Sequence, residues 1–94
     1  MGKSALGFVE TRGHTGSAVA IDAMLKTANV TFVEQIGIGG AFMTAVVRGE
    51  VGAVKSAVDA GMEAAAKVSE LVCANVIPSA HEDVFLLLGI KKEE

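Results

Sequence analysis

The stretch RGEVG at residues 48–52 repeats the arginine and both glycines of an earlier stretch, RGHTG at residues 12–16. Each copy follows a short run with the alternation of a β-strand and precedes a longer run with the apolar spacing of a helix. The dipeptide DA at residues 22–23 also returns, at residues 59–60. A repeat of this kind indicates two similar halves, each of which ends its first strand and begins its helix in the same way.

Hydrophobic periodicity predicts six elements and a short terminal helix. Four runs are rich in β-branched and apolar residues that alternate as in strands, and two longer runs carry apolar residues on one helical face. The order is β-α-β-β-α-β, the split arrangement of ferredoxin-like folds, in which an antiparallel sheet carries both helices on one face. This is an α/β fold of the α+β type. The expected strands are 5–11, 30–36, 42–47 and 71–77, the expected helices are 16–28 and 51–69, and a short C-terminal helix is expected at 81–88.

Two polar features are expected in the helix at 16–28. Asp22 and Lys26 lie four residues apart on its polar side, which favours an ion pair between them. Either Thr15 or Ser17 is expected to cap its N-terminus, because a hydroxyl oxygen can accept a hydrogen bond from the first free backbone N–H groups.

The composition indicates one small domain with more apolar material than it can bury alone. The chain has 94 residues, of which 51% are apolar, and its mean hydropathy is +0.50. We expect a single domain over 1–94, with a core at about 4–88 and a charged tail at 91–94. A domain of this length buries only about 60 to 65% of its unfolded surface, so the apolar excess favours oligomerisation. A spanning helix is not expected, since charges interrupt every apolar run before the roughly 18 residues that it needs: these are Asp22, Lys26, Glu34, Arg48, Lys55 and Asp59.

Several classes of partner are disfavoured. The net charge is -3 with the signs interspersed, and the chain lacks Trp and Tyr, so nucleic-acid binding is not expected. The single cysteine, Cys73, cannot form an internal disulfide, and we expect it to be buried. No Cys/His spacing suits a metal, so neither a metal nor a cofactor is predicted. The first residues, MGKSAL, carry no secretion or lipidation motif, which favours a cytosolic setting.

The run QIGIGGA at residues 35–41 is a second unusual feature, with three glycines in four positions. A dinucleotide-binding fingerprint would need a third glycine where Phe42 stands and a helix after it, whereas a strand is expected there. A hairpin turn, whose glycines supply positive φ angles, is the simplest interpretation. Three glycines exceed what a tight turn requires. The alternative is a backbone-lined loop that approaches other chains or a solute closely.

No catalytic site is predicted. A Ser/His/Asp set can be assembled on paper from Ser17, His81 and Asp22, but no nucleophile elbow surrounds any serine. His14 and His81 each lack a second ligand at metal spacing, and both are expected on the surface or at the start of a helix. Four charged strand residues are expected to form ion pairs rather than to act as acids or bases: Glu10, Arg12, Glu34 and Arg48.

Four motifs in order resemble the bacterial microcompartment (BMC) domain. They are ALGFVETRG at residues 5–13, DAMLKTANV at 22–30, VRGEVGAV at 47–54, and VIP at 76–78 with His81. The resemblance extends over about residues 4–88.

The resemblance implies a structural shell protein rather than an enzyme. In this family the subunits form cyclic hexamers that tile into the facets of a polyhedral shell around encapsulated enzymes, in the bacterial cytoplasm and together with other shell proteins. The loop between the second and third strands lines a central pore for small polar metabolites. The matching residues here are Gly37, Ile38, Gly39 and Gly40, with either Gly40 or Ile38 at the narrowest point.

The resemblance also implies an edge at which neighbouring hexamers meet, formed by Lys26, Asn29, Ser79 and His81. Ser79 stands where the family usually has an arginine, and Ala41 stands where it commonly has a glycine. An oligomeric small-molecule-binding regulatory domain of ferredoxin-like fold is the alternative, and an enzyme comes third. The regulatory domain would have a ligand cleft between subunits and would form no extended sheets.

Overall fold

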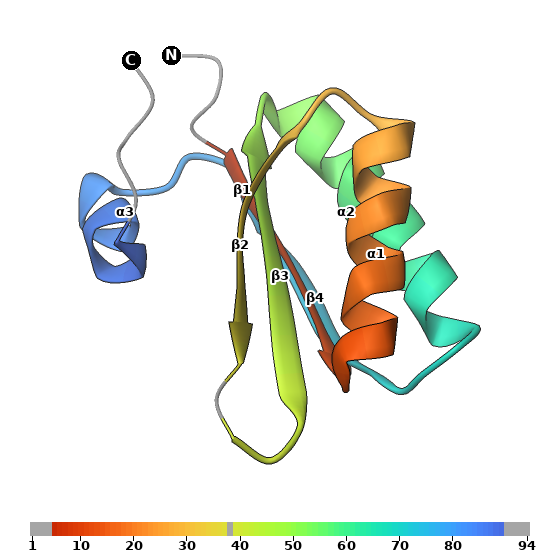
Figure 1. The fold of residues 1–94 in the computed structure, drawn as a ribbon. Helices are drawn as coiled ribbons and strands as arrows, with labels where there is room; N and C mark the ends of the chain where they lie inside the picture. Colours follow the sequence, from red (N-terminus) through yellow and green to blue (C-terminus); the bar gives the residue numbers. More distant parts are fainter. Residues whose placement is uncertain (1–4, 38, 90–94) are drawn as a thin grey trace.

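A computed structural model describes residues 5–37 and 39–89 (Figure 1). The charged tail expected at 91–94 therefore lies outside the described residues. Within them the order is strand, helix, two strands, helix, strand and short helix, as predicted. The elements are β1 (Ala5–Arg12), α1 (His14–Thr27), β2 (Thr31–Gly37), β3 (Phe42–Gly49), α2 (Val51–Ala66), β4 (Leu71–Ile77) and α3 (Glu82–Leu88).

The four strands form one antiparallel sheet in the order β2-β3-β1-β4. Strand β1 lies in the middle and pairs with β3 from Ala5 opposite Gly49 to Arg12 opposite Phe42. The two halves of the chain therefore interleave, because each half contributes one central and one edge strand. This is the ferredoxin-like arrangement that the repeat predicted.

Helices α1 and α2 cover one face of the sheet (Figure 1). The core between the sheet and these helices contains the strand residues Val9, Ala45 and Val47, all fully buried. The helices approach each other closely at Gly61, where a methyl group would lie 2.8 Å from the Cγ of Met24. The molecule is thin, with extents of 35 × 27 × 15 Å.

Helix α3 packs at one end of the opposite face (Figure 1). Phe85 enters a second, smaller cluster with Leu6 and Val46, whose side chains alternate with those that face α1 and α2. The guanidinium of Arg48 lies over the Phe85 ring at 5.0 Å from its centroid. The sheet is therefore covered on both faces, by α1 and α2 on one and by the expected C-terminal helix at one end of the other.

The start of α1 differs from the prediction. The N-cap residue is Gly13, at a φ of 94°, and no side chain makes a capping hydrogen bond, so the prediction of Thr15 or Ser17 as the cap was wrong. Ser17 is fully buried, and its hydroxyl accepts a hydrogen bond from the Gln35 Nε2 at 2.9 Å. In the second copy of the repeat a side chain does cap the helix: Glu50 accepts hydrogen bonds from the first backbone N–H groups of α2.

Cys73 is exposed, which corrects the expectation of a buried thiol. The reason is topological, since β4 is an edge strand and α3 covers only the far end of that face. The thiol donates a hydrogen bond to the Glu10 Oε1 at 3.3 Å. This hydrogen bond, together with some burial and the charge of the Glu10 carboxylate, raises the pKa of the Cys73 thiol.

Candidate functional site

The glycine-rich run forms the loop between β2 and β3. Gly39 and Gly40 are exposed and have φ angles of 49° and 65°, and Ala41 follows at 70°. Ile38 lies outside the described residues. The loop joins two antiparallel strands, which confirms the hairpin interpretation, and no helix begins after it, so the phosphate-binding fingerprint was rightly disfavoured.

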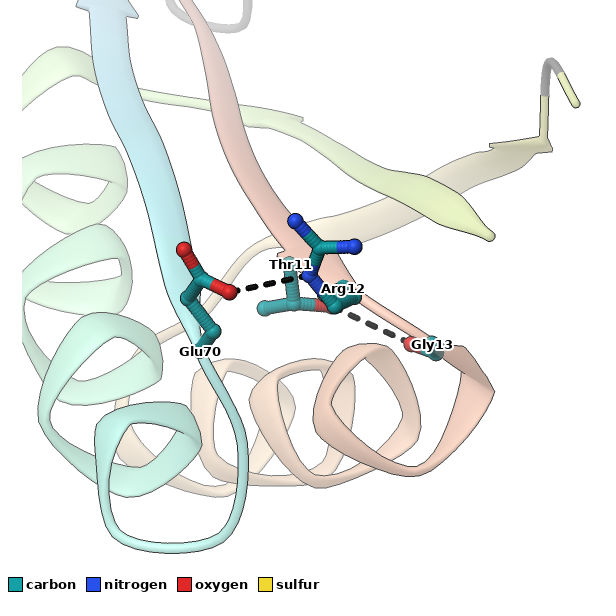
Figure 2. A network of polar contacts seen from close by, with 4 residues as sticks. All are labelled: Thr11, Arg12, Gly13 and Glu70. Carbon is teal, nitrogen blue, oxygen red and sulfur yellow. Dashed lines mark hydrogen bonds and ion pairs between the residues drawn. The ribbon is translucent and has the colours of Figure 1, made fainter. Parts of the chain in front are cut away.

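The base of this loop is fastened to the junction of β1 and α1. The backbone N–H of Gly13 donates to the carbonyl oxygen of Ala41. The Arg12 guanidinium lies over the Phe42 ring at 4.9 Å from its centroid, and its Nε donates to the Glu70 Oε1 at 2.9 Å. Figure 2 shows this ion pair beside the hydrogen bond from the Thr11 hydroxyl to the Gly13 carbonyl, 3.3 Å long.

The expected edge residues lie at the other end of the sheet. The register puts Gly37 and Arg12 at the loop end, and it puts Ile77 at the opposite end, beside Leu6. Lys26 in the last turn of α1 is exposed, and Asn29 follows it; Ser79 and His81 are exposed on the connection from β4 to α3 (Figure 1).

Two of the expected edge residues, Lys26 and His81, make polar contacts within the chain. Lys26 Nζ lies 3.0 Å from the Asp22 Oδ2, so the predicted ion pair is confirmed. His81 is the N-cap of α3, where its Nδ1 accepts a hydrogen bond from the Asp83 backbone N–H at 3.0 Å. The position of His81 at a helix start agrees with the prediction, but its capping bond was not predicted, because histidine is not among the usual capping residues.

Ser17, His81 and Asp22 do not form a catalytic triad. The Ser17 hydroxyl is engaged by Gln35, the Asp22 carboxylate by Lys26, and His81 by the start of α3. Among residues 5–37 and 39–89, no group of three or more His, Cys, Asp or Glu side chains could hold a metal ion. In the same ranges, no helix is long and apolar enough to cross a membrane.

The prediction of ion pairs for four charged strand residues is confirmed for Arg12, whose partner is Glu70, a residue just before β4 that the sequence did not single out. Glu10 instead accepts a hydrogen bond from Cys73, and Arg48 lies over the Phe85 ring.

The pair of Arg12 and Glu70 can be predicted only when the sheet topology is known, because β4, which pairs with β1, lies far along the chain. Phe42 was interpreted as a strand residue that stands where a dinucleotide fingerprint would need a glycine. Glu70 and Phe42 both lie at the base of the glycine-rich loop.

A family model described as the BMC domain matches residues 5–80, which include all the strands, α1, α2 and the glycine-rich loop. The chain belongs to the BMC domain family. This confirms the resemblance drawn from the four motifs.

Curated relatives of similar length are described as shell proteins. The chain is 50% identical to the bacterial microcompartment shell protein PduA of Citrobacter freundii, over 94% of this chain and 95% of that protein. It is also 50% identical to the shell protein EutM of Escherichia coli, over 85% of this chain and 82% of the relative. A carboxysome shell protein of Halothiobacillus neapolitanus is 45% identical over 96% of the chain.

A solved structure agrees with the fold. A microcompartment protein from Desulfitobacterium hafniense superposes with a TM-score of 0.80 at 26% identity, over 96% of this chain. The chain spans 49% of the length of that solved protein. The antiparallel sheet and its helices are therefore those of a microcompartment protein.

Proposed function

We propose that this BMC-domain chain is a structural shell protein that forms cyclic hexamers, and that these hexamers tile edge to edge into the facets of a bacterial microcompartment. Its residues 1–94 act as a single domain, and its place is the shell, within the bacterial cytoplasm. Its partners are other copies, other shell proteins and the encapsulated enzymes. The family membership and the shell proteins among its relatives support this role, and the chain acts as a structural element rather than as an enzyme.

One observation carries the proposal. The glycine-rich loop and the exposed edge residues lie at opposite ends of a molecule that is thin in its third dimension, with extents of 35 × 27 × 15 Å. A thin molecule of this form can direct one end to a symmetry axis and the other end to the rim of a ring. Six copies then make a flat disc whose centre is lined by loops and whose rim carries Lys26.

The centre of the disc is a pore for small polar metabolites in this proposal. Gly37, Gly39 and Gly40 offer no side chains, so backbone N–H and C=O groups form much of the lining. Gly39 has open space around it, since a methyl group there would meet nothing within 4 Å. A pore narrowed by Gly40 is wide and polar, whereas one narrowed by Ile38 is tight and apolar.

The rim of the disc is the contact between tiles. Lys26 extends into solvent with 75% of its side chain exposed, and Asn29, Ser79 and His81 are exposed near the same end. Ser79 lacks the five donors of the arginine that the family usually has there, so each contact contains fewer hydrogen bonds. Tiling therefore depends more strongly on Lys26.

Negative-stain electron microscopy of the purified chain and a Lys26→Ala variant tests the proposal. The native chain should form sheets or tubes with a hexagonal lattice, and the variant should form separate discs. Lys55→Ala is the matched control, because Lys55 is an exposed cation on α2 that is not among the edge residues. Lattices that persist in Lys26→Ala would contradict the proposed edge. Small particles that are not ring-shaped, in all three proteins, would contradict the tile and favour the regulatory domain.

A further inference from the structure

The Phe42 ring lies beside the space that a side chain at Gly40 would enter. A methyl group added at Gly40 would lie 3.6 Å from the Cδ2 of Phe42, within van der Waals range of the ring. The Arg12 guanidinium lies over the same ring, 4.9 Å from its centroid. Phe42, the first residue of β3, therefore links Arg12 on β1 to the end of the exposed loop.

Arg12 is fixed at its other side. Its Nε donates to the Glu70 Oε1 at 2.9 Å (Figure 2). Its backbone N–H donates to the Glu70 carbonyl oxygen at 3.0 Å. The two bonds tie β1 to the start of β4 at the end of the sheet that carries the loop. A planar guanidinium held in this way can stack on an aromatic ring while it donates in its plane to a carboxylate.

A second tie reaches the loop through the backbone. The N–H of Gly13, next to Arg12, donates to the Ala41 carbonyl oxygen between Gly40 and Phe42. The loop itself contributes little to its own position, because Gly39 and Gly40 have no side chains. Its conformation is therefore governed by what holds its base.

We propose that Arg12 is a positioning residue for Gly39, Gly40 and Ala41 of the loop. Through Phe42, and with Glu70 as its brace, it sets where Gly40 lies and so sets the aperture that six loops leave. The part of this inference that concerns the aperture rests on the proposed pore, whereas the part that concerns the loop holds for a single chain. The cause is stacking geometry rather than positive charge alone, since Glu70 already balances the charge of Arg12.

Four variants separate geometry from charge. Arg12→Ala removes both, Arg12→Lys keeps the charge without the planar group, and Phe42→Leu removes the ring while leaving the charge in place. The double variant Arg12→Ala/Phe42→Leu completes a cycle. Arg12 has a side chain that is 53% exposed, so its variants should fold. Lys55→Ala serves as the control for loss of one exposed cation elsewhere.

Amide hydrogen exchange at the base of the loop is the first readout, and the informative amide is the Gly13 N–H, which donates to the Ala41 carbonyl oxygen. Losing one cation–π contact at a partly exposed site should speed exchange of this amide, relative to its intrinsic rate, by about two- to fivefold. Arg12→Ala, Arg12→Lys and Phe42→Leu should all show this increase, the double variant should show no further increase, and α2 peptides should not change. Native-like exchange of the Gly13 amide in Arg12→Ala, or additive effects in the double variant, would overturn the proposal.

Ion conductance of the protein in planar lipid bilayers is the second readout. The native protein and Lys55→Ala should share one conductance, and Arg12→Lys and Phe42→Leu should both deviate from it in the same direction. If the native protein conducts and these variants match it, Arg12 does not set the aperture. If the native protein forms no ring and no pore, the proposed function fails, and hydrogen exchange still decides whether Arg12 holds the loop.

Discussion

At the scale of single residues, the loop contains one position that its residue does not suit. Ala41 has a φ of 70°, in the left-handed region where a Cβ is strained, and the resemblance to the family had marked it as a common glycine position. The neighbouring Gly39 and Gly40 adopt positive φ without this cost. The loop therefore combines two residues that fit its backbone with one that opposes it.

Ala41→Gly should stabilise the fold by about 0.5 to 1 kcal/mol, because relief of the strained φ exceeds the extra backbone entropy that glycine gives the unfolded chain. Urea unfolding at one fixed protein concentration measures the change. Ala18→Gly, at an exposed position within α1, is the control and should destabilise by about 1 kcal/mol. Equal losses in both variants would show that Ala41 is not strained.

The reactivity of the Cys73 thiol tests its hydrogen bond to the Glu10 carboxylate. The hydrogen bond to Glu10 raises the thiol pKa, so the thiolate that reacts with alkylating reagents is scarce near pH 8. Glu10→Ala should lower this pKa towards its ordinary value and speed alkylation of the folded protein by iodoacetamide. Unfolded chains of both proteins, which have lost the contact, should react at equal rates and serve as the control. A folded variant that reacts no faster than the native protein would argue against the contact.

The same pair predicts the sign of a pH effect on stability. The folded chain holds the thiol proton more tightly than the unfolded chain does, because the folded pKa is raised. The resulting stabilisation is fully present below the ordinary thiol pKa and is lost as the pH rises through the raised value. Glu10→Ala should therefore flatten the loss of stability in alkaline solution.

At the scale of elements, α3 depends on its cap more than a longer helix would. It has seven residues, and the His81 Nδ1 that accepts from the Asp83 N–H satisfies one of its few free donors. Only an imidazole nitrogen without a proton can accept this bond.

His81→Ala should destabilise α3 by about 1 kcal/mol, and His81→Asn should restore most of the loss, since asparagine is a favourable N-cap residue. Hydrogen exchange of peptides that contain Phe85 gives the local measurement. His14→Ala is the matched control, because His14 is exposed at the start of a helix whose cap makes no side-chain hydrogen bond. Faster exchange of these peptides after His14→Ala, with no change after His81→Ala, would contradict this prediction.

The contact between α1 and α2 depends on a missing side chain. A methyl group at Gly61 would lie 2.8 Å from Met24 Cγ and 3.4 Å from the Ala20 carbonyl oxygen, so a larger residue must shift the Met24 side chain or α1 itself. Gly61→Val should destabilise the fold by about 1 to 3 kcal/mol.

Met24→Ala makes room at the same point, and the Gly61→Val change should cost less in that background than alone. Thermal unfolding of the four proteins in this cycle gives the coupling. Additive losses would mean that the two residues do not share the space.

The elements themselves were largely predictable from the sequence. Their order, the strand at 71–77 and the repeated junction follow from periodicity and from the RG motif, because these signals are local. The helix expected at 51–69 ends instead at Ala66, where the chain turns back and the N–H of Ser69 bonds to the Ala65 carbonyl oxygen. Helix ends depend on such contacts, and propensity alone does not specify them.

The site was predictable in part. The glycine-rich loop is visible in the sequence because three glycines in four positions are unusual, whereas the Arg12–Glu70 pair requires knowing that β4 returns beside β1. The exposure of Cys73 likewise depends on which strand lies at the edge of the sheet. Tertiary neighbours determined these two features, so single-sequence reasoning missed them. The cap at His81 is a local hydrogen bond, and it was missed because histidine is not among the usual capping residues.

At the scale of the whole molecule, the apolar excess in the composition has a visible counterpart. Leu86 and Leu87 on α3 have exposed fractions of 77% and 84%, and Val68 near the end of α2 has 53%. Isolated exposed apolar residues are ordinary on monomers, but a chain that is 51% apolar at this length fits a subunit whose surface is partly covered by other copies. The thin form and the separation of loop and edge favour a ring.

The central claim is that six copies surround an axis with their loops at 37–41 inward and Lys26 outward. Cryo-electron microscopy of the purified native assembly measures this arrangement most directly. The account predicts rings of six, each with a central opening bordered by Gly40 or Ile38 and with Lys26 at the contact between neighbouring rings. A ring with another number of subunits, or one in which the loops lie at the rim and Lys26 near the axis, would contradict it.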